Sequence, residues 1–314
     1  MRRQRDRSSV PIAALVVVAL VLAACSARPV ESLAIRTELP AEAVQISGFV
    51  ADAAIPSKAG AQNVLALSGG GADGAFGAGV LVGWSETGKR PQFDIVTGVS
   101  TGAFMASLAF LGPHHDGALR ELYTNQSNDT ILINKGVGGL LTESLYDETP
   151  LKKLIEKIVT KEFLREVAAA HATGRRLYIA TTNLDGGELV VWDMGKIATG
   201  NRADPVLMFQ KILRASAAVP GLFPPVYIKP VKGKELRQAH VDGGVKAPVL
   251  IRNFMFETPA PKRNLYVVIN GSLNRLNAAD AVEANLADIG KKSITEIMRS
   301  LMDTTIYQGY VAAR

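Results

Sequence analysis

The pentapeptide Gly98-Val99-Ser100-Thr101-Gly102 has the residue types of a nucleophilic turn. It follows an apolar run, residues 93–97, and precedes a run of small and apolar residues, which predicts a junction between a strand and a helix. In that context G-x-S-x-G is typical of a nucleophile elbow, in which Gly98 and Gly102 relieve crowding around a sharp turn. We therefore predict that Ser100 is a catalytic nucleophile, with a chemically silent glycine-rich turn as the alternative.

A serine nucleophile needs a base to take its proton. His240 and Asp242 are the two candidates, because both lie near the end of a predicted strand and project to the same side of it. The other histidines, His114, His115 and His171, stand in polar segments, where solvent-facing positions are expected. Residue types alone leave both bases open.

A glycine loop precedes this turn in the chain. Gly69, Gly71 and Gly74 satisfy G-x-G-x-x-G between a predicted strand and a predicted helix, which is the local pattern of a dinucleotide site. The same backbone amides could instead stabilise an oxyanion that forms during catalysis. Asp94 is a poor ribose ligand, because it lies near the start of the next predicted strand and such a ligand belongs at the carboxyl end.

The surrounding pattern predicts the elements that position these residues. Two successive strand, glycine turn and helix units, residues 63–88 and 93–112, indicate parallel strands covered by helices. Two further strands are expected on either side of Asp185-Gly186-Gly187, because Asp-Gly favours a tight hairpin turn. Residues 113–175 are less regular, and we interpret them as an insertion or a lid.

Composition excludes some classes of protein. The chain has 314 residues and a net charge of +6. Much of that excess lies in the first 24 residues, so the remaining chain is nearly neutral, which does not suggest nucleic-acid binding. The single cysteine, Cys25, excludes an internal disulfide.

The N-terminus predicts export and a lipid anchor. Residues 1–24 have a basic start, an apolar stretch and then small residues, which is the pattern of a signal peptide. Leu22 to Cys25, LAAC, resembles the lipobox of bacterial lipoproteins, which implies cleavage before Cys25 and lipidation of that residue. Residues 25–62 are then a tether, and residues 63–314 form the catalytic domain. Ser26 follows Cys25, and by resemblance to Gram-negative sorting signals this implies the outer membrane if the host has one. A plain secretory signal and an uncleaved anchor are the alternatives.

Four motifs together resemble the patatin-like phospholipase family. They are GGGADG at 69–74, GVSTG at 98–102, ASAAVPGLFPPV at 215–226 and VDGG at 241–244. Their order and spacing match that family over about residues 63–305. The resemblance implies a three-layer α/β/α fold with a mainly parallel central sheet.

The resemblance also implies the chemistry of the site. Ser100 would be the nucleophile and Asp242 the base of a dyad, and the amides of Gly69, Gly70 and Gly71 would form the oxyanion hole. No metal, nucleotide or other cofactor is implied, and the substrate would be a membrane lipid.

One residue departs from the family pattern. Asp73 stands where Arg or Lys usually precedes the last glycine of the loop, and a carboxylate there opposes stabilisation of an oxyanion unless it points outward and caps the next helix. Three other hypotheses therefore stay open: an esterase that uses Ser100 and His240, a nucleotide-binding domain, and a non-catalytic envelope lipoprotein.

Overall fold

The structure is a computed structural model, and it describes residues 43–45, 60–124, 133–135, 144–200, 203–229, 237–256 and 259–271. Residues 1–24, Cys25 and almost all of the tether up to residue 62 lie outside these ranges, as do residues 272–314. Among the described helices, none is long and apolar enough to cross a membrane.

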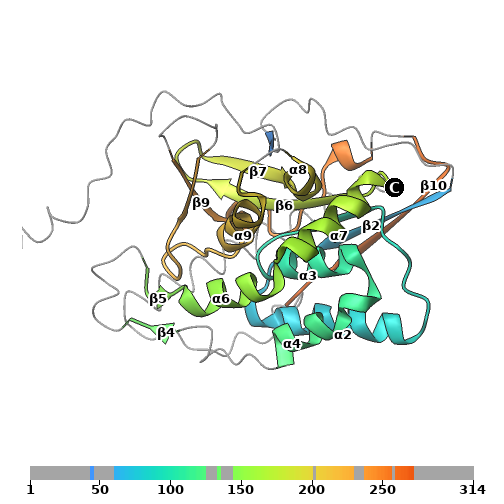
Figure 1. Cartoon of the computed structure of the whole chain (residues 1–314), viewed down its shortest axis with the longest axis horizontal. Coiled ribbons are helices and arrows are strands. Elements are labelled where there is room, and N and C mark those ends of the chain that lie inside the picture. Colours follow the sequence, from blue (N-terminus) through green and yellow to red (C-terminus); the bar gives the residue numbers. More distant parts are fainter. Residues whose placement is uncertain are drawn as a thin grey trace, which may run out of the picture.

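A mixed sheet of eight strands forms the centre of the molecule (Figure 1). Its path runs β1-β7-β6-β3-β2-β10, and β9 and β8 extend from the far end of β6. The strands are β1 (Ala43–Gln45), β2 (Ala61–Leu67), β3 (Ile95–Gly98), β6 (Arg176–Asn183), β7 (Glu188–Asp193), β8 (Val226–Ile228), β9 (Gln238–Asp242) and β10 (Lys262–Val268). A separate ribbon pairs β4 (Ile133–Asn134) with β5 (Tyr146–Asp147).

The two parallel strands predicted from the sequence, β2 and β3, lie at the centre of the parallel half of this sheet. β10, β2, β3 and β6 are parallel neighbours. β3 is buried along its whole length and β2 along most of it, which explains why they read as continuous apolar runs. The other half is antiparallel. The Asp185-Gly186-Gly187 turn folds β7 back onto β6, as expected, and β9 returns antiparallel to the end of β6.

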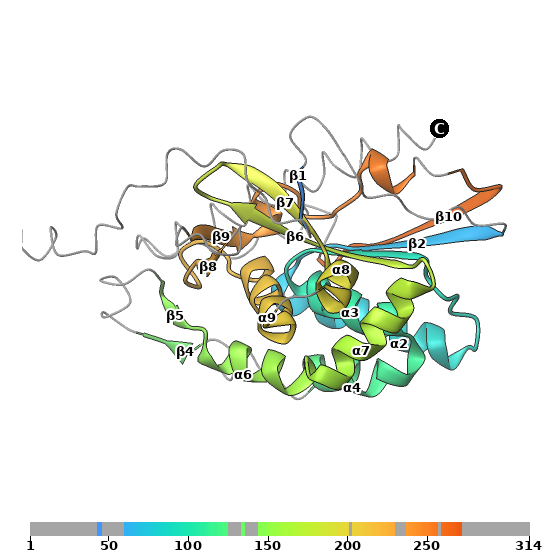
Figure 2. The ribbon, with the colours of Figure 1, turned by 45° about the horizontal axis from the view of Figure 1, so that its top comes forward.

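All the described α-helices lie on one face of the sheet (Figure 2). They are α2 (Gly74–Glu86), α3 (Thr101–Leu111), α4 (Asp116–Thr124), α6 (Thr149–Ile158), α7 (Lys161–Ala172), α8 (Met194–Thr199) and α9 (Pro205–Ser216). α3 is buried on nearly every side, so it is the central helix of the layer. The opposite face is covered by the segment 247–255, which buries Leu250, Phe254 and Met255. The chain thus has the α/β fold expected of the family.

Residues 113–175 were interpreted as an insertion or a lid, and the described part of this region contributes α4, α6 and α7 to this layer. α4 packs on α2 and α3, α6 packs on α9, and α7 packs on α8 and α3. α7 buries Phe163, Leu164 and Val167. The described part of the region is therefore continuous with the hydrophobic core, and the glycines at 136, 138 and 139 lie outside the described residues.

Candidate active site

The turn after β3 holds Ser100 in a strained backbone conformation. Ser100 has φ 56° and ψ −127°, and it is the one residue other than glycine with positive φ in the described part of the chain. Such a conformation costs of order 1–3 kcal/mol and persists only where its surroundings fix it. The structure therefore places Ser100 on a sharp turn between a buried strand and the start of α3.

The two glycines that flank Ser100 are required by close packing. A β-carbon on Gly98 would lie 2.3 Å from the Gly102 carbonyl oxygen, and one on Gly102 would lie 2.5 Å from the Leu67 carbonyl oxygen. Carbon and oxygen atoms do not approach this closely, so a side chain at Gly98 would push α3 away from β3, and one at Gly102 would push the turn away from β2. The G-x-S-x-G pattern of this chain thus has a steric cause.

A second serine fixes the backbone of the turn. The amide of Ser100 donates to Ser216 Oγ at 2.9 Å, and Ser216 Oγ donates to the Ala180 carbonyl on β6 at 2.8 Å. Both serines are buried. Ser216 was not predicted to be a site residue, although it lies in the motif at 215–226 that carries the family resemblance.

Asp242 lies at the end of β9 and is completely buried. Its amide donates to the Ala218 carbonyl at 2.9 Å, and Gly244 donates to its Oδ1 at 2.7 Å. Oδ2 has no hydrogen bond of normal geometry to any described residue. Burial raises the pKa of Asp242 to about 7, and the neighbouring Ser100 hydroxyl and the Gly244 amide partly offset this rise.

The structure thus brings Ser100 and Asp242 together. The Ser100 hydroxyl is close enough to influence the pKa of the Asp242 carboxyl, but the pair does not make a regular hydrogen bond. Catalytic hydrogen bonds are commonly long or poorly aligned before substrate binds. A carboxyl with a pKa near neutrality can both accept and return a proton at physiological pH.

His240 lies on the same strand, but its contacts are with other residues. Nδ1 is 2.9 Å from Thr181 Oγ1, which also accepts a hydrogen bond from Trp192 Nε1, and the imidazole packs against the Trp192 ring. Burial lowers the pKa of His240 to about 4. Such a residue is a weak base, and no contact in the described structure joins it to Ser100.

The glycine loop lies directly beside Ser100. A β-carbon on Gly69 would lie 3.2 Å from the Ser100 β-carbon. The amide of Gly69 donates to the Pro248 carbonyl at 2.8 Å, so it is not free to bind an oxyanion, and the prediction that included Gly69 in the oxyanion hole was wrong. Gly70 and Gly71 have φ of 153° and 57°, both are exposed, and neither amide has an acceptor among the described residues.

Asn270, just after β10, holds the glycine loop in place. Its amide donates to Ser68 Oγ and its Nδ2 donates to the Ser68 carbonyl, both at 2.8 Å. Its Oδ1 accepts from the amide of Gly77 in the first turn of α2 at 3.1 Å. A β-carbon on Gly70 would lie 2.4 Å from the Asn270 carbonyl oxygen, so only glycine fits there.

Asp73 occupies the N-cap position of α2, but its side chain makes no capping hydrogen bond, contrary to one expectation. The side chain is exposed, and Oδ2 lies toward Gly271.

Asp94, the candidate acidic residue for a nucleotide site, does not lie near the glycine loop. Asp94 precedes β3 and accepts from the Asn63 amide at 2.7 Å, at the opposite end of the strand from the glycine loop.

A cavity of about 250 Å³ opens at Ser100 and at Gly71. Its walls are mostly apolar and come from α3, α4, α6 and the segment after α9. The apolar lining residues are Phe104, Leu122, Tyr123, Leu151, Leu154, Ala217, Val219, Leu222 and Phe223. An apolar channel that ends at a strained serine is suited to an acyl chain.

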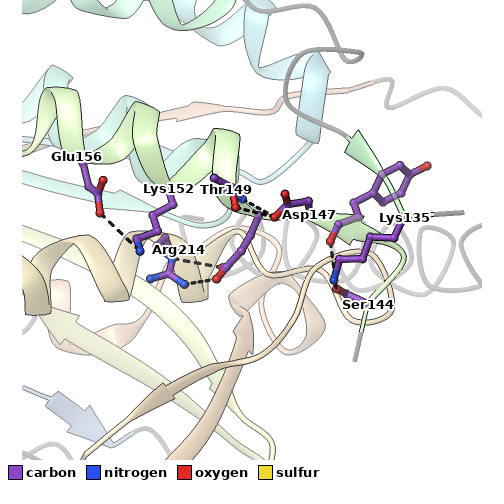
Figure 3. Close-up of polar contacts among 9 residues, drawn as sticks. Lys135, Ser144, Asp147, Thr149, Lys152, Glu156 and Arg214 are labelled. Carbon is purple, nitrogen blue, oxygen red and sulfur yellow. Dashed lines mark hydrogen bonds and ion pairs between the residues drawn. The ribbon is translucent and has the colours of Figure 1, made fainter. Parts of the chain in front are cut away.

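Polar contacts fix the outer wall of this cavity. Arg214, near the end of α9, forms an ion pair with Glu148, the N-cap residue of α6 (Figure 3). Asp147 accepts from the Thr149 amide and hydroxyl at 2.9 and 2.8 Å, which defines the start of α6. These contacts hold Leu151 and Leu154 of α6 against the cavity.

Tyr123 closes another side of the cavity. Its hydroxyl is 2.5 Å from Thr101 Oγ1 and donates to the Thr101 carbonyl at 3.1 Å. Burial raises the pKa of Tyr123 to about 12, so the phenol stays protonated and is not a base for Ser100.

An elbow serine, a buried carboxyl and a glycine loop thus meet at one apolar cavity, an arrangement that can support acyl transfer through a serine nucleophile. A family model described as patatin-like phospholipase matches residues 65–255, which is more than half of the chain. The chain belongs to the patatin-like phospholipase family.

Comparisons with individual proteins add less. No curated protein matches the chain. Among solved structures it is similar to VipD from Legionella pneumophila, with 17% sequence identity and a TM-score of 0.45 over 70% of this chain. The chain spans about half the length of VipD, 52%.

Proposed function

We propose that this protein is a membrane-anchored lipid acyl hydrolase, acting on phospholipids or lysophospholipids through a Ser100–Asp242 dyad. The observation that carries the proposal is the position of Ser100: it stands on a strained elbow, beside a buried carboxyl with a pKa near 7, at the mouth of an apolar cavity. A histidine esterase is disfavoured, because His240 is bound to Thr181 and its pKa is about 4.

The first half of the reaction forms an acyl-enzyme. Ser100 Oγ attacks the ester carbonyl carbon while its proton passes to Asp242 Oδ2, the oxygen without another hydrogen bond. The negative charge on the carbonyl oxygen would be stabilised by the amides of Gly70 and Gly71, and each such donor is worth about 10²–10³ in rate. The tetrahedral intermediate then collapses, and the bond between the carbonyl carbon and the alcohol oxygen breaks. The alcohol leaves with the proton that Asp242 had accepted, and Ser100 carries the acyl group.

The second half reverses these roles. Asp242, again ionised, takes a proton from a water molecule, and the resulting nucleophile attacks the acyl-enzyme carbonyl. The same two amides receive the oxyanion. Its collapse breaks the bond to Ser100 Oγ, which regains the proton from Asp242, and the fatty acid leaves through the apolar cavity. One residue thus serves as base and acid in both halves.

The anchor belongs to the proposal on sequence grounds. A signal peptide at residues 1–24 followed by a lipidated Cys25 would place the enzyme in a bacterial cell envelope, at the surface of its substrate. Two or more acyl chains would give lasting attachment, since each buried CH₂ contributes about 0.8 kcal/mol.

Covalent labelling tests the proposed nucleophile. The full chain is treated with a fluorophosphonate, which reacts with activated serines, and the adduct is located by peptide mass spectrometry. We expect a single adduct on Ser100, because its hydroxyl lies beside a buried carboxyl. Folded protein in which Ser100 remains unmodified would instead support a non-catalytic envelope lipoprotein.

Ser216→Ala tests how the elbow is held. The substitution removes the hydroxyl that accepts from the Ser100 amide and donates to the Ala180 carbonyl, and leaving the buried Ser100 amide unsatisfied costs about 1–3 kcal/mol. We expect kcat to fall about 10-fold with KM nearly unchanged, because Ser216 does not line the cavity. Steady-state kinetics with a soluble ester measures both constants.

Ser107→Ala is the matched control for this variant. Ser107 is also buried, and its hydroxyl donates to the backbone carbonyl of Ala103 at 2.9 Å. It lies on α3, whereas Ser216 lies on α9, and it has no hydrogen bond to Ser100. Equal kinetics for the two variants would mean that the contact between Ser216 and Ser100 has no part in catalysis.

A further inference from the structure

A second cluster of reactive side chains lies at the other end of the central helix from Ser100. Within the part of the chain that the structure describes, His114, His115 and Glu166 are the one group of three potential metal ligands whose ligand atoms all lie within 4.8 Å of one another. Both histidines belong to the short helix η3 (Pro113–His115), directly after α3, and Glu166 lies on α7. Ser100 caps the opposite end of α3, which at 1.5 Å per residue is about 16 Å away.

The geometry of the cluster is convergent. His114 Nε2 and His115 Nε2 lie 2.9 and 2.8 Å from the same carboxylate oxygen, Glu166 Oε2. The two imidazoles are 4.4 Å apart between ring centres, and His115 also packs edge-to-face on Phe163 of α7. Two histidine nitrogens from η3 thus converge on one carboxylate oxygen from α7, and the cluster is open to solvent on the His114 side.

The chemistry of these donors selects a class of ion. Two imidazole nitrogens and one carboxylate are a three-ligand set used for Zn²⁺, with further positions left to water. Imidazole suits zinc and similar transition metals, whereas Mg²⁺ and Ca²⁺ prefer oxygen ligands. Metal–ligand bonds of about 2.0–2.2 Å require the nitrogens and the oxygen to separate slightly, and exposed side chains can make this adjustment.

We propose that His114, His115 and Glu166 form a binding site for a divalent transition metal of the zinc class, which joins η3 to α7. Binding would replace the two hydrogen bonds from His114 and His115 to Glu166 with three bonds to the metal, which would link η3, at the end of α3, to α7. Because the cluster lies at the opposite end of α3 from Ser100, about 16 Å away, we assign it a role in stabilising the contact between these elements, outside the catalytic reaction.

Calorimetry of untagged, metal-free full-length protein in detergent tests the site. We expect ZnCl₂ to bind with one equivalent per chain and MgCl₂ to give no binding. Zinc should also raise the melting temperature, since a ligand that binds the folded state shifts the unfolding equilibrium. Absence of stoichiometric zinc binding would overturn the proposal.

Two variants and one control assign the binding to these residues. His115→Ala and Glu166→Gln should each weaken zinc binding by about 10–100-fold or more. Loss of a residue that only supports a metal ligand already lowers affinity by about that factor, and these two residues are ligands themselves. Glu162→Gln removes a more exposed carboxylate from the same helix, which pairs with Arg165, and should leave zinc binding unchanged. If zinc binds both test variants as tightly as the wild type, the ion lies elsewhere and the proposal fails. Neither readout depends on lipid hydrolysis.

Discussion

Ser100→Ala is expected to abolish ester hydrolysis, lowering kcat by about 10⁴–10⁶-fold, the range found when the nucleophile of a serine hydrolase is removed. The substitution deletes the one oxygen that could attack the carbonyl carbon. It keeps the β-carbon and does not remove the hydrogen bond from the Ser100 amide to Ser216 Oγ, so the elbow should persist. Release of fatty acid from phospholipid vesicles and hydrolysis of a p-nitrophenyl ester measure the loss.

The thermal stability of the same variant separates chemistry from folding. The melting temperature should change little, because the Ser100 hydroxyl is not part of the hydrophobic core. Ser107→Ala, which removes a buried hydroxyl elsewhere on α3, should keep wild-type hydrolysis. Equal rates for Ser100→Ala and the wild type would show that the elbow serine is not the nucleophile.

The features that the sequence predicted well are local in the chain. The elbow glycines, the strand before Ser100 and the Asp185-Gly186-Gly187 hairpin each depend on residues within a few positions of one another. The apolar period and the glycine positions report such features directly. For this reason the sequence alone predicts the parallel strands β2 and β3 and the turn that carries Ser100.

The features that were missed connect distant parts of the chain. Asn270 holds Ser68 across 202 positions and Ser216 holds Ser100 across 116 positions. The Pro248 carbonyl accepts a hydrogen bond from the amide of Gly69, which the family resemblance had assigned to the oxyanion hole. The sequence around these residues does not identify their partners. A buried polar group forms its hydrogen bond with whichever element lies beside it in the fold, however far away that element is in the chain.

The two candidate bases illustrate the same limit. Alternation along a strand places His240 and Asp242 on one side, and it cannot tell which of them faces Ser100. Tertiary packing distinguishes the two residues. His240 contacts Thr181 and Trp192. Asp242 lies at the end of β9, where its amide donates a hydrogen bond to the Ala218 carbonyl in the segment after α9. Mutation of the two residues is therefore the decisive comparison.

Asp242→Asn should lower kcat by about 10⁴–10⁶-fold, because Asp242 is itself the base here and removal of the base in a serine hydrolase triad costs about as much as removal of the nucleophile. The amide cannot accept the proton of Ser100, although its oxygen can still accept the Gly244 hydrogen bond. His240→Ala should lower the melting temperature, since it empties a buried site, but keep hydrolysis per folded molecule. Loss of activity in His240→Ala with retention in Asp242→Asn would assign the base to His240.

The pH profile of the wild type follows from the same carboxyl. Asp242 must be ionised to accept a proton, and burial raises its pKa from 3.8 to about 7. We therefore expect kcat/KM to rise with pH and to level off above about 7, because this ratio reports ionisation in the free enzyme. A profile that is already flat between about pH 5 and 6 would mean that Asp242 ionises too readily to be the desolvated base described here.

Stability should change with pH in the opposite direction. Between about pH 4 and 7 the unfolded chain has an ionised Asp242 while the folded protein keeps the proton, so the folded state binds more protons and its free energy of unfolding falls as pH rises. The loss is complete above the folded pKa and amounts to a few kcal/mol, because a tenfold difference in proton affinity between the two states corresponds to about 1.4 kcal/mol. Asp242→Asn carries no charge at any pH, so denaturant unfolding at about pH 8 should find it more stable than the wild type, although it is inactive. A gain in stability together with the loss of hydrolysis would be the mark of a carboxylate kept in a buried site for its chemistry, because a purely structural aspartate would destabilise the fold when replaced.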